Sequence, residues 1–126
     1  MTVRLVWLDG ETIAAALPEL CDILAAVVAN NASVGFMWPV DHAVIARYWQ
    51  GVAAAVTRSA KHIVVAYDAE NRIVGTAQIE QASSANGAHR AEVMKVLVHP
   101  RMQRQGIGLL LMQALEVFAH ERGWWL

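Results

Sequence analysis

The sequence predicts a single α+β domain, an α/β sandwich in which helices cover the faces of a mixed sheet. Short β-branched segments alternate with longer segments whose apolar residues recur every three or four positions, in the order β-α-α-β-β-β-α followed by the start of a further strand. A helical segment separates the last two strands, and such a crossover joins parallel strands. The length of 126 residues fits one domain over residues 1–126.

The composition excludes several classes of protein. A net charge of -1 provides no basic surface for phosphate neutralisation, so nucleic acid is not an expected partner. The apolar runs fall far short of the roughly 20 residues that cross a bilayer, so no membrane segment is expected. Asp9 and Glu11 interrupt the stretch that a secretory signal would need, which favours a cytoplasmic protein.

The first half of the chain predicts one strand and two helices. The strand is Val3–Leu8, before the turn signal Asp9-Gly10. Thr12 is predicted to cap a first helix, with Pro18 in a first helical turn, and a second helix begins near Asp41. The two apolar stripes consist of Leu20, Ile23, Leu24, Val27 and Val28, and of Val44, Ile45, Tyr48, Trp49, Val52 and Val56.

The segment between these helices is unusually apolar for a loop. It contains Phe36, Met37 and Trp38, followed by Pro39. Such residues either fill the core or line a binding cleft, and both alternatives stay open. In the second case Phe36, Met37 and Trp38 are substrate-binding residues.

The second half predicts a hairpin, a third strand and a long helix. The hairpin joins His62–Tyr67 to Arg72–Gln81, with Gly75 marking a bulge. Arg90–His99 is the next strand, closed by Pro100. A helix follows this strand and ends at Gly123, and Trp124–Leu126 is the start of one more strand. The apolar stripe of the helix consists of Ile107, Leu110, Leu111, Ala114, Leu115 and Phe118.

The loop between that strand and helix is a predicted anion site. The unpaired N–H groups and the positive dipole end of a helix N-terminus favour phosphate, and Gly106 and Gly108 permit close approach. Arg101 and Arg104 add positive charge. The loop lacks the Gly-Lys-Ser or Gly-Lys-Thr of a nucleoside-triphosphate loop, and Leu111 stands where a dinucleotide fingerprint needs glycine or alanine.

The pattern Gln-x-x-Gly-x-Gly, placed after the strand that ends Val96-Leu97-Val98-His99-Pro100, resembles the GNAT superfamily of N-acetyltransferases. The resemblance implies that acetyl-CoA is the co-substrate. It also implies that strand backbone pairs with the pantetheine arm and loop backbone holds the pyrophosphate. The implied cofactor-binding residues are Val96, Leu97, Val98, Gln103, Arg104, Gln105, Gly106, Ile107, Gly108 and Leu109.

A closer resemblance is to the tabtoxin-resistance acetyltransferase and its relatives, and it implies a small-molecule amine as acceptor. It rests on Ala32–Met37, Asn86-Gly87, Arg90–Val93 and Lys95.

Glu92 is the expected catalytic residue. Alternate strand residues share a face, which would place Glu92, Met94, Val96 and Val98 together, with Glu92 about 20 Å from Val98. A CoA molecule lying along the strand would bring its thioester toward Glu92, which could take the proton of a substrate ammonium. The alternative is a surface carboxylate paired with Arg90 or Lys95. Glu80 and His89 are weaker candidates, and the histidines form no ligand pair that predicts a metal.

The resemblance further implies a helix and two strands after Trp124–Leu126, including the usual source of the general acid, so the chain matches an incomplete domain. An open surface beside Arg90–His99 predicts a homodimer. Three functional hypotheses follow: an acetyltransferase acting on a small amine, a CoA-binding or dimerising module without turnover, and a structural interaction domain.

Overall fold

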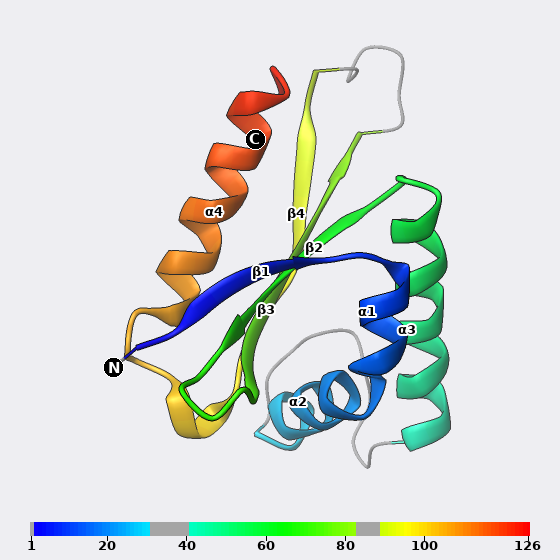
Figure 1. Cartoon of the computed structure of the whole chain (residues 1–126), viewed down its shortest axis with the longest axis vertical. Coiled ribbons are helices and arrows are strands. Elements are labelled where there is room, and N and C mark those ends of the chain that lie inside the picture. The colour runs from blue at the N-terminus through cyan, green and yellow to red at the C-terminus, as the bar shows by residue number, and fades with distance from the viewer. Residues whose placement is uncertain (1, 31–40, 83–88) are drawn as a thin grey trace.

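The computed structural model describes residues 2–30, 41–82 and 89–126. Its sheet has the strand order β1-β2-β3-β4, with antiparallel neighbours throughout. Helix α4 covers one face and α1, α2 and α3 cover the other (Figure 1), which confirms the predicted sandwich. The strands are Arg4–Leu8 (β1), His62–Tyr67 (β2), Ile73–Gln81 (β3) and Ala91–Val98 (β4); the helices are Gly10–Ala15 (α1), Leu17–Ala29 (α2), His42–Thr57 (α3) and Ile107–Glu121 (α4).

The region predicted as the first helix consists of two helices. Asp9, and not Thr12, caps α1: the Asp9 carboxylate accepts the Thr12 N–H at 2.8 Å, and the Thr12 hydroxyl accepts the Asp9 N–H at 2.8 Å. This reciprocal capping box satisfies two backbone donors. Helix α2 then begins at Leu17 with Pro18 in its first turn, as predicted.

Two apolar clusters, one on each face of the sheet, form the core. The cluster under α1 to α3 includes the fully buried Trp49 and Leu24, and the cluster under α4 includes Leu111 and Leu115. Helix α3 begins at its cap Asp41, as predicted. Apolar stripes that repeat at helical spacing therefore pack onto the sheet.

The β2–β3 hairpin contains the predicted irregularity. Ala66 lies opposite Gly75, but Tyr67 lies opposite Ile73, so Val74 is the extra residue of a bulge that Gly75 flanks. The hairpin turn is held by the Asp68 carboxylate, which accepts the N–H groups of Glu70 and Arg72.

The last residues return to the sheet beside β4. Gly123 follows α4 with a φ of +71°, and Trp125 then forms a parallel bridge with Arg90. Two hydrogen bonds make the bridge: Ala91 N–H donates to Trp125 C=O at 2.9 Å, and Trp125 N–H donates to His89 C=O at 2.7 Å. The parallel direction of this last pair is as predicted. Among the described residues, no helix combines the length and apolar character needed to cross a membrane.

Candidate active site

A bulge in β4 decides which side chains reach which face. Gln78 lies opposite Met94 and Thr76 lies opposite Leu97, so β4 has one residue more than β3 between these pairs. Lys95, in the bulge, has a φ of +51°, which a non-glycine residue rarely adopts. An extra residue shifts the side-chain alternation by one position.

The predicted common face of Glu92, Met94, Val96 and Val98 is therefore wrong for Val98. Glu92 lies opposite Glu80, on the face toward α3, whereas Val98 lies opposite Gly75 and packs in the cluster under α4. The bulge between them reverses the alternation. A prediction that assumes regular strand geometry fails at this point because this bulge falls at Lys95, where no glycine marks it in the sequence as Gly75 marks the bulge in β3.

The loop after β4 exposes a series of backbone donors. Pro100–Met102 forms a short 3-10 turn (η2), and Gln103 donates its side-chain amide to the Val98 carbonyl at 3.4 Å. Arg104 and Gly106 then have φ values of +65° and +83°. The backbone N–H groups of residues 104–109 donate to no acceptor in the described part of the chain. Together with the N-terminal dipole of α4, these donors can hold an anion.

The two glycines of this loop differ in their surroundings. Gly106 needs its positive φ, which disfavours any side chain. Gly108 has no such constraint: a Cβ there would lie 3.8 Å from the nearest atom, Val98 Cγ2, which is ordinary van der Waals contact. The space above Gly108 is therefore open to a ligand, while Arg101 and Arg104 are exposed nearby in sequence.

Glu92 contacts Arg90, which is one of the two partners predicted for it as a surface carboxylate. Its Oε1 lies 3.3 Å from Arg90 Nη2, and its side chain is 53% exposed. Lys95 Nζ instead lies over the ring of Tyr48, 5.8 Å from its centroid. Exposed pairs of this kind contribute little to stability, so the Arg90 contact leaves the Glu92 carboxylate accessible.

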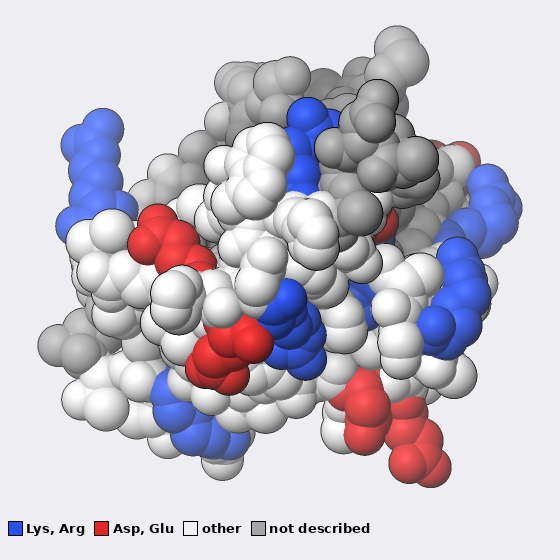
Figure 2. Space-filling model, turned by 90° about the horizontal axis from the view of Figure 1, so that it is seen from above, with Lys and Arg blue, Asp and Glu red and all other residues white. Residues whose placement is uncertain are grey.

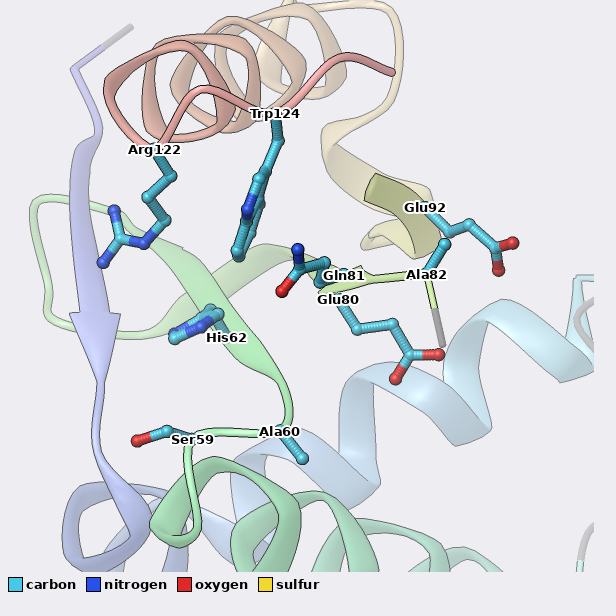
Figure 3. Close-up of a pocket in the computed structure, with 9 residues that line it drawn as sticks. All are labelled: Ser59, Ala60, His62, Glu80, Gln81, Ala82, Glu92, Arg122 and Trp124. Atoms are coloured by element: carbon cyan, nitrogen blue, oxygen red, sulfur yellow. The ribbon is translucent and has the colours of Figure 1, made fainter. Parts of the chain in front are cut away.

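A cavity of about 500 Å³ lies at this end of the sheet (Figure 3). Its walls come from the segment before β2 and the first residue of β2, the end of β3, the start of β4 and the segment after α4; the lining residues are Ser59, Ala60, His62, Glu80, Gln81, Ala82, Glu92, Arg122 and Trp124. Viewed from this end, acidic and basic side chains are interspersed on the visible described surface (Figure 2). Of the lining residues, Glu92 was the expected proton acceptor and Glu80 a weaker candidate.

Two residues of the cavity wall, His62 and Arg122, contact the ring of Phe118 behind them, and sequence reasoning did not find this aromatic group. The rings of His62 and Phe118 are 4.8 Å apart, and the Arg122 guanidinium lies 3.4 Å from the Phe118 centroid. Partial burial, followed by the positive charge of Arg122, holds the pKa of His62 below its usual 6.5. No spacing in the sequence could reveal this group, because its members are brought together only by packing of α4 on β2.

The remaining site predictions have different outcomes. Phe36, Met37 and Trp38 lie outside the described residues. Val96, Leu97 and Val98 form the end of β4, and the segment from Gln103 to Leu109 forms the loop and first turn of α4. Within residues 2–30, 41–82 and 89–126, no group of three or more His, Cys, Asp or Glu side chains is arranged to hold a metal.

The fold is similar to those of several solved acetyltransferases. Similar solved structures include the aminoglycoside acetyltransferase meta-AAC0020 from an uncultured soil metagenomic sample, solved with sisomicin. It has 21% identity and a TM-score of 0.71, over 98% of this chain and 73% of the other. The GCN5-related N-acetyltransferase of Kribbella flavida has 19% identity and a TM-score of 0.72, over 97% and 67%. At these identities the similarities establish the fold alone.

A third similar structure is the paiA N-acetyltransferase of Thermoplasma acidophilum, solved with coenzyme A, at 14% identity and a TM-score of 0.66 over 98% of this chain and 75% of the other. The model of the acetyltransferase (GNAT) family matches residues 31–126, which contain β2 to β4, the loop and α4. The family assignment and the exposed backbone donors at the start of α4 agree, and the chain belongs to the GNAT family of acetyltransferases.

Proposed function

We propose that this chain transfers an acetyl group from acetyl-CoA to a primary amine of a small molecule. The observation that carries the proposal is the series of backbone N–H groups at residues 104–109, which have no acceptor in the described part of the chain and precede or begin a 15-residue helix. A pyrophosphate carries the negative charge and the acceptor oxygens that such a site favours.

The end of β4 is suited to an extended ligand. In the described sheet β4 pairs with β3 on one side, and on its other side contacts only the bridge at Trp125. Backbone groups of Val96, Leu97 and Val98 on the open side can pair with the amides of a pantetheine arm, just as an edge strand pairs with an added strand. The arm would then lead from the loop toward Glu92.

Glu92 is the proposed proton acceptor. Acetyl-CoA supplies the acetyl group as a thioester. Glu92 takes a proton from the substrate ammonium, which leaves a free amine that can attack the thioester carbonyl carbon. A backbone N–H of β4 donates to the carbonyl oxygen as negative charge develops there. The nitrogen–carbon bond forms as the carbon–sulfur bond breaks, and the sulfur leaves as a thiolate that takes up a proton.

The proposed acceptor is a small amine, such as a toxin or antibiotic that the cell inactivates. An aminoglycoside acetyltransferase with this fold was solved with sisomicin. The resemblance to the tabtoxin-resistance acetyltransferase points to the same acceptor class, and Phe36, Met37 and Trp38 are its proposed contacts. We place the activity in the cytoplasm.

A module that binds CoA without turnover is the second hypothesis. The observation that favours it is that Glu92 already has a cationic partner, Arg90, although this exposed contact is weak and leaves the carboxylate accessible. Both hypotheses predict that the loop binds CoA, and only the transferase hypothesis predicts turnover. Release of free thiol in the presence of candidate amines distinguishes them.

The proposed homodimer would cover the open side of β4. Val96, Trp125 and Leu126 are exposed there, with 38%, 58% and 48% of their surface accessible. Burial of such side chains is favourable. A monodisperse monomer in analytical ultracentrifugation at micromolar concentration would contradict the dimer.

Titration of the purified chain with acetyl-CoA in a calorimeter tests the loop first. The matched variant replaces both Gly106 and Gly108 by valine. Micromolar binding by the native chain that the double variant loses would support the pyrophosphate site, whereas the absence of binding by the native chain would contradict the transferase hypothesis.

A further inference from the structure

One end of the cavity carries three side chains that can donate hydrogen bonds: Ser59, His62 and Arg122. They belong to the turn after α3, to β2 and to the C-terminal cap of α4. In the part of the chain that the structure describes, none of the three side chains donates to an acceptor or forms an ion pair. In Figure 3 these groups lie on the left, whereas the carboxylates of Glu80 and Glu92 lie on the right.

Aromatic rings hold the two nitrogen-bearing groups in place. The guanidinium carbon of Arg122 lies 3.4 Å from the Phe118 centroid and 5.9 Å from that of Trp124. The His62 ring lies 4.8 Å from the ring of Phe118 and 6.2 Å from that of Trp124. A guanidinium that rests over the face of a ring keeps its N–H groups, which lie in its own plane, available to an acceptor. The half-buried indole of Trp124 lines the cavity beside them.

The charges at this end of the cavity favour an anion. Partial burial and then the positive charge of Arg122 lower the pKa of His62 below its usual 6.5. No counterion for Arg122 is present among the described residues. An anion beside both groups would be attracted by Arg122 and would favour the protonated form of His62.

Ser59 occupies a position where glycine would be more stable. Its N–H donates to Val56 C=O at 3.0 Å, and the N–H of Ala60 donates to Ala55 C=O at 2.9 Å, which are the two hydrogen bonds of a Schellman motif. The φ of Ser59 is +61°, in the left-handed region where glycine is usual. The chain thus retains a hydroxyl at the rim of the cavity at a cost in backbone conformation.

We propose that this end of the cavity binds a small aromatic carboxylate. The carboxylate accepts hydrogen bonds from Arg122, His62 and Ser59, and the ring of the ligand lies against Trp124. A guanidinium matches the two oxygens of a carboxylate, and aromatic rings stack on an indole. The acidic side chains at the other end of the cavity disfavour ligands with more than one negative charge. This site takes no part in the proposed acetyl transfer, and its test needs no acetyl-CoA.

The test titrates the full chain with benzoate and with two reference compounds. Benzamide keeps the ring and lacks the charge, and acetate keeps the carboxylate and lacks the ring. Calorimetry should show that benzoate binds about tenfold more tightly than either compound. A proton NMR titration should show that saturating benzoate raises the pKa of His62.

Two variants test the proposed contacts. Arg122→Gln should weaken benzoate binding by about tenfold or more, the effect of one charge-assisted hydrogen bond. The matched control is Arg47→Gln, exposed on α3 and outside the cavity, which should bind benzoate as the native chain does. Ser59→Gly should raise the urea midpoint, because glycine adopts a positive φ freely, and yet weaken benzoate binding. A loss of affinity in a more stable variant cannot result from unfolding.

Several outcomes would overturn the inference: no benzoate binding by the native chain, equally tight binding of benzamide, or unchanged affinity in Arg122→Gln. Tighter binding of inorganic phosphate than of benzoate would do the same, because the ligand would then be a different anion. A pKa of His62 that stays constant at saturating benzoate would place the ligand elsewhere and would also overturn it. Acetyl-CoA binding and turnover are separate measurements, so the proposed function stands or fails independently of this site.

Discussion

Gly75 on β3 lies directly opposite Val98 on β4, and the first turns of α4 pack against this pair. A Cβ at Gly75 would lie 2.8 Å from Ile107 Cγ2 and 3.1 Å from Leu111 Cδ1. The absence of a side chain at Gly75 thus sets how closely the start of α4 approaches the sheet. The same helix start carries the exposed backbone donors.

Gly75→Ala should destabilise the chain by about 1–3 kcal/mol, because the added methyl group overpacks the contact with the stiff Ile107 side chain. The matched control is Gly51→Ala, in the middle of α3, where a Cβ meets no atom within 4 Å. That change should stabilise by about 0.5–1 kcal/mol. Urea denaturation with an unchanged m-value measures both, and effects of the same sign would contradict the packing argument.

Gly106→Ala should mainly affect the stability of the fold, whereas Gly108→Ala should mainly affect the affinity for acetyl-CoA. Gly106→Ala places a side chain at a φ of +83° and should cost about 1–2 kcal/mol of folding free energy. Gly108→Ala should leave the free energy of unfolding unchanged or slightly raised, yet weaken acetyl-CoA binding by about tenfold or more, since it fills space reserved for the ligand. Denaturation measures the free energy of unfolding of each variant, and calorimetry on the same samples measures its affinity for acetyl-CoA. Unchanged affinity in Gly108→Ala would place the pyrophosphate elsewhere.

Asp9 should make stability depend on pH at the acidic end. Hydrogen bonds from Thr12, the backbone bond first, lower the pKa of Asp9 below its usual 3.8. The folded chain therefore keeps the carboxylate ionised where the unfolded chain binds a proton. The stabilisation is present above the unfolded pKa and is lost as pH falls through the folded value.

Asp9→Asn retains a capping side chain without a charge, so it should show a smaller loss of stability between neutral pH and pH values below 3.8 than the native chain. Asp9→Ala should lower stability at neutral pH as well. Urea midpoints at both ends of the range measure this. An equal acid-induced loss in the native chain and in Asp9→Asn would show that the cap does not titrate as proposed.

Arg122→Gln should raise the pKa of His62 without restoring the usual 6.5. Burial is the larger cause of the lowered pKa and remains, while the charge of Arg122 is removed. Arg122→Lys, which keeps the charge, should preserve the lowered pKa. A proton NMR titration of the His62 ring measures the change. Because neutral His62 is favoured on folding, its contribution to stability is full above 6.5 and falls as pH drops through the folded pKa.

The sequence by itself predicted the strands and the helices except for the division between α1 and α2, and the loop motif indicated the family. Apolar stripes at helical spacing predicted α2, α3 and α4, and Gly106 and Gly108 after β4 predicted an anion site at a helix start. These features are local: a stripe or a positive φ depends on neighbouring residues. Asp9 could have been recognised in the same way, because Asp followed three residues later by Thr is a local capping pattern.

Tertiary structure decided which residues share a face and a cavity. The bulge at Lys95 turns Val98 toward α4 and leaves Glu92 opposite Glu80, which regular alternation could not reveal. His62 and Arg122 meet only because α4 packs across β2. Register and packing depend on contacts between residues far apart in the chain, and no single segment encodes them.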